Sequence, residues 1–186
     1  NEPGIIGKLL DAGAQGVIVP MVNSAEEAQA AVDACCYPPL GARSWGPSGA
    51  APRLDNYFTA SGDQVATIVM VETVQALNNV DAIVNTPGVD AVYVGPADLS
   101  ISLGLPPGNN DDAAEFTEAL HAIVAACQNA GVVPGIHSSG SLTPLRLEQG
   151  FRMITVTADN VAMNVGVQAE LARARGEGAE GSNSMY

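Results

Sequence analysis

Five short apolar runs in this sequence each end in, or are soon followed by, a residue that marks the carboxyl end of the run. In chain order, these residues are Pro20, Glu72, Asp98, His137 and Asp159, and all but Pro20 carry side chains capable of chemistry. Short, nearly continuous apolar runs are typical of strands buried in a parallel sheet. Because active sites of parallel α/β proteins lie at the carboxyl ends of the strands, these positions are the candidate site residues.

Glu72 and Asp98 follow consecutive runs. Neighbouring strands lie about 4.8 Å apart, so the two carboxylates can converge on one cation. Oxygen ligands with coordination positions left open for water or substrate suit Mg²⁺ or Mn²⁺. The pair therefore predicts a divalent metal site. The alternative interpretation makes Asp98 a helix N-cap and Glu72 a capping or salt-bridged residue.

The segment Gly95-Pro96-Ala97-Asp98 predicts an anion-binding turn beside this metal site. Gly95 permits close approach of the backbone, and the N–H groups of Ala97 and Asp98 can bind a carboxylate at the start of a turn or helix. Pro96 contributes no donor. The alternative interpretation is that the Gly-Pro pair marks only a turn.

His137 at the same edge could orient a substrate or transfer a proton, although a structural histidine at the rim is an equal alternative. Asp159 precedes Asn160 and is interpreted as a helix N-cap. Arg43 and Arg53 lie in a long irregular segment, where a bidentate contact with a carboxylate, a solvated position and an intersubunit position all stay open.

Lysine is almost absent from the sequence. The single lysine is Lys8, which lies in a predicted helix and not at the end of a strand. An aldolase that forms a Schiff base, or an enzyme that uses pyridoxal phosphate, needs a lysine at its active site. The glycines of segment 11–16 precede a strand and therefore do not form a phosphate-binding loop. The position of Lys8 thus excludes Schiff-base chemistry within this segment, and the order of the glycines excludes a phosphate-binding loop.

The candidate residues require strands that alternate with helices. The predicted strands are 17–20, 67–71, 91–94, 132–137 and 153–157, and the predicted helices are 3–13, 24–36, 57–63, 75–85, 112–130, 141–149 and 160–175. This alternation predicts an α/β protein with a parallel sheet covered by helices. Five strands suffice for an open doubly wound sheet, whereas a (β/α)₈ barrel needs eight, and the pattern alone does not separate the two. Residues 176–186, rich in Gly, Ser and Glu, are predicted to form a flexible tail.

Composition excludes several classes of partner. The formal net charge is −13, with 7 basic and 20 acidic residues, which disfavours binding to nucleic acid or to an anionic membrane. Cysteines 35, 36 and 127 lack the spacing of a zinc site and give an odd count, so they are interpreted as packing residues. A reducing cytoplasm fits this usage.

Several blocks of the sequence resemble the HpcH/HpaI family of class II, metal-dependent pyruvate aldolases, such as 4-hydroxy-2-oxoheptanedioate and 2-dehydro-3-deoxyglucarate aldolase. The blocks are Gly13–Val22, Tyr37–Pro47, Val71-Glu-Thr73, Pro87–Asp90 and Gly95-Pro-Ala-Asp-Leu-Ser100. The similarity runs in order from about residue 1 to 175, and the Glu-Thr and Gly-Pro-Ala-Asp-Leu-Ser blocks are its most specific part.

The resemblance implies a (β/α)₈ TIM barrel that assembles into trimers or hexamers. It implies that Glu72 and Asp98 bind Mg²⁺, Mn²⁺ or a similar ion such as Co²⁺, and that the backbone at Ala97 and Asp98 binds the carboxylate of pyruvate. The implied reaction cleaves or forms 4-hydroxy-2-oxo acids through a pyruvate enolate at the metal and an aldehyde.

Two departures from the family pattern affect these expectations. Met70 occupies a position that is glutamine in some members, and this loses a polar contact. The catalytic histidine and the enolate-stabilising arginine of the family belong to its first three strands, and Asn1 matches the point just after the third. Residues 1–175 are therefore expected to be a partial barrel, with five parallel strands in sequence order and Glu72 beside Asp98 at one rim.

Two other functions stay open. A citrate-lyase-like enzyme that cleaves a carbon–carbon bond of an acyl-CoA uses a similar barrel and carboxylate pair, but it needs a basic patch for the coenzyme. A non-catalytic partner subunit or barrel fragment has no such requirement.

Overall fold

Five parallel strands form one sheet in the computed structural model, which describes residues 1–53 and 55–177. The strands are β1 (Gly16–Val19), β2 (Ala66–Met70), β3 (Ala91–Val94), β4 (Val133–His137) and β5 (Met153–Thr155). Their spatial order is β1-β2-β3-β4-β5, and every neighbouring pair is parallel. This arrangement confirms the predicted strands and their order. The predicted tail lies mostly outside the described residues.

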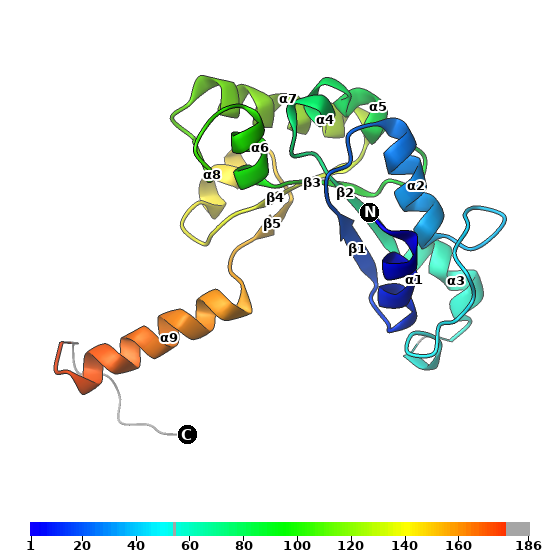
Figure 1. Cartoon of the computed structure of the whole chain (residues 1–186), viewed down its shortest axis with the longest axis horizontal. Coiled ribbons are helices and arrows are strands. Elements are labelled where there is room, and N and C mark those ends of the chain that lie inside the picture. Colours follow the sequence, from blue (N-terminus) through cyan, green and yellow to red (C-terminus); the bar gives the residue numbers. More distant parts are fainter. Residues whose placement is uncertain (54, 178–186) are drawn as a thin grey trace.

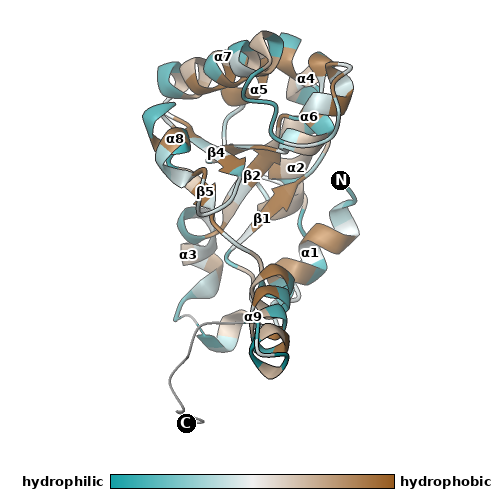
Figure 2. Ribbon diagram, turned by 90° about the vertical axis from the view of Figure 1, so that its left-hand side faces the viewer, coloured by the Kyte–Doolittle hydropathy of each residue, from teal (hydrophilic) through white to brown (hydrophobic). Residues whose placement is uncertain are grey.

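Helices cover one face of the sheet and leave the other face open. Val69, Val92 and Ile136 point toward the helices and are fully buried, because apolar side chains there pack between the two layers. On the opposite face Ile18 and Val133 keep 44% and 43% of their surface exposed. Figure 2 shows the apolar colouring of the strands continuing across the sheet. The core therefore lies between the sheet and its outer helices.

Nine α-helices and one short 3₁₀ helix are present in the described residues. They are α1 (Pro3–Asp11), α2 (Ala25–Cys35), the 3₁₀ turn Ala51–Arg53, α3 (Tyr57–Gln64), α4 (Val74–Asn78), α5 (Val80–Val84), α6 (Pro96–Ser102), α7 (Ala114–Ala130), α8 (Thr143–Glu148) and α9 (Asp159–Ala174). None of them combines the length and the hydropathy that a membrane span requires. Helix α9 projects away from the sheet and from the other helices (Figure 1).

Two local predictions were wrong. The single helix predicted over 75–85 is two helices, because Asn79 leaves helical geometry (φ −107°, ψ 7°) while its side-chain amide donates to the Asn23 carbonyl at 2.7 Å. Asp159 is not an N-cap: Ala158 holds that position, and Asp159 is the first helical residue.

Ser24 is the N-cap of α2. The Glu27 N–H donates to Ser24 Oγ at 3.3 Å, whereas the Glu27 carboxylate accepts from the N–H of Asn23 at 2.6 Å. The reciprocal contact of a capping box is thus shifted back by one residue. At the other end of α2, Cys35 is buried, and burial raises the pKa of its thiol, which agrees with a packing role.

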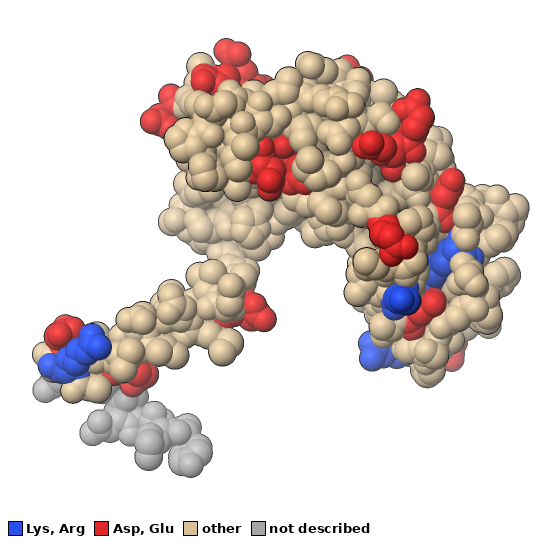
Figure 3. All heavy atoms as spheres, in the orientation of Figure 1, with Lys and Arg blue, Asp and Glu red and all other residues tan. Residues whose placement is uncertain are grey.

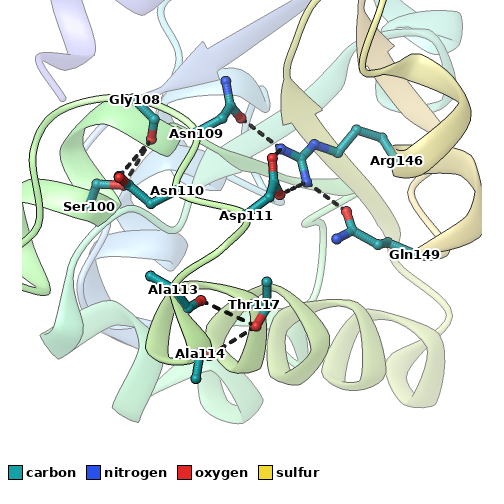
Figure 4. A network of polar contacts seen from close by, with 10 residues as sticks. All are labelled: Ser100, Gly108, Asn109, Asn110, Asp111, Ala113, Ala114, Thr117, Arg146 and Gln149. Atoms are coloured by element: carbon teal, nitrogen blue, oxygen red, sulfur yellow. Dashed lines mark hydrogen bonds and ion pairs between the residues drawn. The ribbon is translucent and has the colours of Figure 1, made fainter.

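Arg146 of α8 holds the loop between α6 and α7. Its buried guanidinium donates to both carboxylate oxygens of Asp111, at 2.6 and 2.8 Å, and also to Asn109 and Gln149 (Figure 4). Asn110 in turn donates to the hydroxyl of Ser100 at 2.8 Å, which connects this loop to α6. Through these contacts α8 holds the loop after α6, and the loop in turn holds α6 at Ser100.

Replacing Arg146 with Met is expected to lower the free energy of unfolding by about 3 kcal/mol, because Asp111, whose side chain is 25% exposed, loses the buried bidentate partner that holds it. Urea unfolding followed by circular dichroism measures the change. Arg173→Met is the matched control: its partner Glu170 lies on the exposed surface of α9, so little change is expected. Equal stability of the Arg146→Met variant and the native protein would contradict the anchoring role.

Candidate metal and substrate site

The carboxyl ends of β2 to β5 bring several predicted site residues into one row on the open face of the sheet. Met70 pairs with Tyr93, so two residues further along Glu72 lies opposite Gly95. Val94 pairs with Ile136, which places Gly95 level with His137, and His137 pairs with Thr155. This register creates a continuous edge from β2 to β5.

Glu72 is held in a fixed position at this edge. Only 2% of its surface is exposed, and its Oε1 accepts a hydrogen bond from the N–H of Met21 at 2.8 Å. Met21 adopts a left-handed backbone conformation (φ 56°), which is uncommon for a residue other than glycine and concentrates at functional sites. The strained turn after β1 therefore presents its N–H to the carboxylate of Glu72.

The carboxylate of Glu72 lies directly over Gly95. A Cβ atom at position 95 would lie 2.2 Å from Glu72 Oε2 and 2.9 Å from the methyl group of Met70. A side chain there would displace the ends of Glu72 and Met70, so glycine serves a steric purpose, since the backbone angles of Gly95 (φ −94°, ψ 96°) are open to any residue. Gly95 thus makes room for the predicted metal ligand.

Asp98 lies in the first turn of α6 and its side chain is exposed. The N-cap of α6 is Gly95, so the alternative interpretation of Asp98 as an N-cap is wrong. Glu72 is likewise not a cap, because Thr73 caps α4, and it has no salt bridge to any described residue. Both carboxylates are therefore left without a structural role in capping or ion pairing.

The two carboxylates interact electrostatically. Burial raises the pKa of Glu72 most, and the nearby negative charge of Asp98 raises it further, while the Met21 N–H opposes the shift. A cation between the carboxylates would relieve this repulsion. Among the described residues no group of three or more His, Cys, Asp or Glu side chains could hold a metal. A pair of carboxylates fits an ion such as Mg²⁺, which keeps several water ligands.

His137 lies at the end of β4 on the same open face. Its Nδ1 is 3.4 Å from the hydroxyl of Tyr93, which also hydrogen-bonds the hydroxyl of Thr155. Tyr93 is only 5% exposed, and burial raises the pKa of its hydroxyl. The sequence prediction placed His137 correctly at the rim but missed Tyr93 and Thr155. Strand alternation could have found both, because they occupy inner-face positions of β3 and β5.

The arginines singled out in the sequence do not reach this edge. Arg43 is buried, donates to Asp11 Oδ1 at 2.7 Å and to the hydroxyl of Tyr57 at 3.2 Å, and so lies near the end of α1 that precedes β1. A solvated position for Arg43 is therefore wrong. Arg53 lies beside Gly13, also before β1. Pro20 ends β1 without supplying a polar group, and the backbone of Met21 supplies it instead.

Comparisons with known proteins identify the family to which the fold and the sequence are similar. The family model described as HpcH/HpaI aldolase/citrate lyase matches residues 1–165. The chain is 37% identical to a hydroxypyruvate/pyruvate aldolase of Rhizorhabdus wittichii and 38% identical to a 4-hydroxy-2-oxo-heptane-1,7-dioate aldolase of Klebsiella pneumoniae. These alignments cover 94% and 93% of this chain but 70% and 66% of the relatives. A crystal structure of a family protein from Burkholderia cenocepacia superposes with a TM-score of 0.83 at 32% identity, over 94% of this chain and 70% of that one.

Proposed function

The chain belongs to the HpcH/HpaI aldolase/citrate lyase family, and we propose that it is a divalent-metal-dependent aldolase, a carbon–carbon lyase. Its substrates are 4-hydroxy-2-oxo acids, which it cleaves to pyruvate or another 2-oxo acid and an aldehyde, or forms from them. The relatives named above are aldolases, and this chain spans 66 to 70% of their length.

The observation that carries the proposal is the carboxylate of Glu72, buried over Gly95 and repelled by Asp98. These two residues would hold Mg²⁺ or Mn²⁺, with Co²⁺ as a further candidate, because both supply oxygen ligands and leave other positions free. The ion supplies Lewis-acid polarisation of the carbonyl of the 2-oxo acid. Met21 contributes by fixing one oxygen of Glu72, which preorganises the ligand before the ion arrives.

The first turn of α6 would bind the carboxylate of the 2-oxo acid. Pro96 starts the helix, and the N–H groups of Ala97 and Asp98 belong to the first turn, where backbone donors have no partner within the helix. Both residues are exposed, and Asp98 is near enough to Glu72 to raise the pKa of its carboxyl. An oxo acid bound by these donors would place its carbonyl next to the two carboxylates.

Lys8 supports the metal mechanism by its position. It lies in α1, which packs against α2 on the outer side of the sheet, and the candidate site lies on the open face. This arrangement disfavours a Schiff base between Lys8 and a substrate at Glu72, because the lysine and the candidate site belong to different faces of the sheet.

We also propose that residues 1–175 form part of a (β/α)₈ barrel and that the protein assembles into a trimer or hexamer. Support for the barrel comes from the parallel strands in sequence order and from the greater length of the similar solved structure. Support for assembly comes from α9, in which no residue is buried. Its exposed apolar residues are Val161, Met163, Val165, Val167 and Leu171. Exposed apolar surfaces of this kind mark interaction sites.

A coupled assay of pyruvate release tests the proposed reaction. The protein is given a 4-hydroxy-2-oxo acid, and pyruvate is measured with lactate dehydrogenase before and after removal of metal with a chelator. Release is expected only when Mg²⁺ or Mn²⁺ is present. Metal-independent release, or no release from any 4-hydroxy-2-oxo acid, would contradict the proposal.

His137→Ala is expected to lower kcat/KM for the aldehyde about tenfold, the effect of one lost hydrogen bond to substrate. Metal affinity measured by isothermal titration calorimetry should stay the same, because His137 lies level with Gly95 and does not contact Glu72 in the row of strand ends. A loss of metal binding in this variant would show that the assignment of ligands is incomplete.

An acyl-CoA lyase is the second candidate function, because the family description also names citrate lyase. It needs basic side chains near the site to bind the phosphates of the coenzyme. On the face that Figure 3 shows, the basic side chains lie over α1 and the segment after α2, and at the far end of α9. Arg152 directly precedes β5 and so lies at the amino end of that strand, away from the candidate site. Arg146, on α8, is buried in its own network. This distribution favours the aldolase.

A further inference from the structure

Tyr93, His137 and Thr155 form a polar group on a sheet face that is otherwise largely apolar. The Tyr93 hydroxyl lies 3.4 Å from His137 Nδ1 and hydrogen-bonds Thr155 Oγ1. The side chains of the same face on β1, β2, β4 and β5 are mainly apolar: Ile18, Ile68, Met70, Val133 and Met153. A cluster of three hydrogen-bonding groups in this setting indicates a site that recognises a polar group.

The backbone of β4 is adapted to this cluster. Gly135 pairs with Tyr93, and a Cβ atom at position 135 would lie 3.0 Å from Tyr93 Cδ2. The absence of a side chain at Gly135 therefore lets the Tyr93 ring cross β4 and reach Thr155 on β5. A tyrosine hydroxyl that formed hydrogen bonds only with water would not need to cross β4 in this way.

The cluster adjoins the proposed metal site. Glu72, Gly95 and His137 lie in one row, with Gly95 in the middle. Two strand spacings of about 4.8 Å separate the strand of Glu72 from that of His137, so a small molecule bound at Glu72 on the open face would lie near His137. His137 Nε2 makes no hydrogen bond to any residue in the described part of the chain, while Nδ1 faces Tyr93.

Building on the proposed aldolase function, we infer that Tyr93 is a positioning residue for the aldehyde half of the site. With Thr155 it holds the His137 ring so that Nε2 faces the open side of the sheet next to the proposed metal site, where it hydrogen-bonds a hydroxyl group of the aldehyde. The substrate class is then a hydroxylated aldehyde in preference to an alkyl aldehyde of equal size. A site built to hydrogen-bond a hydroxyl group discriminates strongly against an analogue that lacks it.

Glycolaldehyde and propanal test this inference, because they differ by a hydroxyl group in place of a methyl group. The kcat/KM of aldol addition with pyruvate is measured for both aldehydes. The native protein is expected to prefer glycolaldehyde, and Tyr93→Phe to reduce that preference about tenfold, the effect of one hydrogen bond. Tyr57→Phe is the matched control: it also removes a hydrogen-bonded hydroxyl, which Arg43 contacts before β1, and should keep the native preference.

A double-mutant cycle shows whether Tyr93 acts through His137. If it does, Tyr93→Phe combined with His137→Phe reduces the preference about as much as either change alone. Additive losses, or an unchanged preference in Tyr93→Phe, overturn the inference. Metal-dependent exchange of the pyruvate methyl hydrogens with D₂O, measured on the native protein without aldehyde, tests the proposed function separately. Exchange without any preference between the aldehydes contradicts only the inferred role of Tyr93, whereas absence of exchange contradicts both that role and the proposed function.

Discussion

Glu72→Gln and Asp98→Asn are each expected to reduce aldol cleavage about a thousandfold or more, because polarisation of the substrate carbonyl by the ion is worth several kcal/mol. Each change keeps the shape of the side chain but removes the charge that holds a divalent ion. A single remaining carboxylate is expected to bind the ion only weakly, because Mg²⁺ gives up its water ligands reluctantly. Mn²⁺ binding by isothermal titration calorimetry and pyruvate release measure the two effects together.

Asp81→Asn is the matched control for these variants. Asp81 is an exposed carboxylate in the first turn of α5, away from the strand ends. Both metal affinity and activity are expected to stay native in this variant. If Glu72→Gln or Asp98→Asn kept native metal affinity, the ligand assignment would be wrong.

Gly95→Ala is expected to reduce activity about a hundredfold or more while the protein stays folded, since misplacing a catalytic group by about 1 Å has an effect of this size. The added methyl group would lie 2.2 Å from Glu72 Oε2. To avoid the methyl group, the carboxylate of Glu72 must move, and this strains or breaks the hydrogen bond that its other oxygen accepts from the Met21 N–H at 2.8 Å. Because the proposed metal ligand is displaced, Mn²⁺ affinity is expected to fall together with activity.

Gly7→Ala provides the comparison for this substitution. A Cβ atom at Gly7 would meet nothing within 4 Å, and Gly7 lies inside α1. This variant should keep full activity and gain about 0.5–1 kcal/mol of stability, as Ala replaces Gly in a helix. Native activity in Gly95→Ala would show that the carboxylate of Glu72 does not have to lie over Gly95.

The strands were predictable because their apolar runs reflect burial. Val92 and Ile136 are buried by helices, and nearly continuous apolar runs record this position in a parallel sheet. The break at Asn79 was not predictable in the same way. It depends on a hydrogen bond from Asn79 to the carbonyl of Asn23, which lies 56 residues away in the sequence. Local periodicity contains no information about that contact.

The side chains of the candidate site could be chosen from the sequence, but their support could not. Glu72 and Asp98 were found because each follows a predicted strand. The N–H of Met21, which fixes Glu72, carries no signal of residue type, since every residue except proline has one. The contact between Gly95 and Glu72 was also missed, because Gly95 was interpreted as letting the backbone approach a bound carboxylate, whereas its missing side chain makes room for the carboxylate of Glu72.

Exchange of the methyl hydrogens of pyruvate with D₂O, followed by ¹H NMR, tests the central claim most directly, because it reports enolisation without any aldehyde. The protein is stripped of metal with a chelator, then given Mg²⁺ or Mn²⁺, and Glu72→Gln is treated in the same way. Exchange is expected to stop when metal is removed and to return with the ion in the native protein only. Exchange that persists in the metal-free protein, with Lys8 labelled when borohydride is added with pyruvate, would contradict a metal site at Glu72 and Asp98.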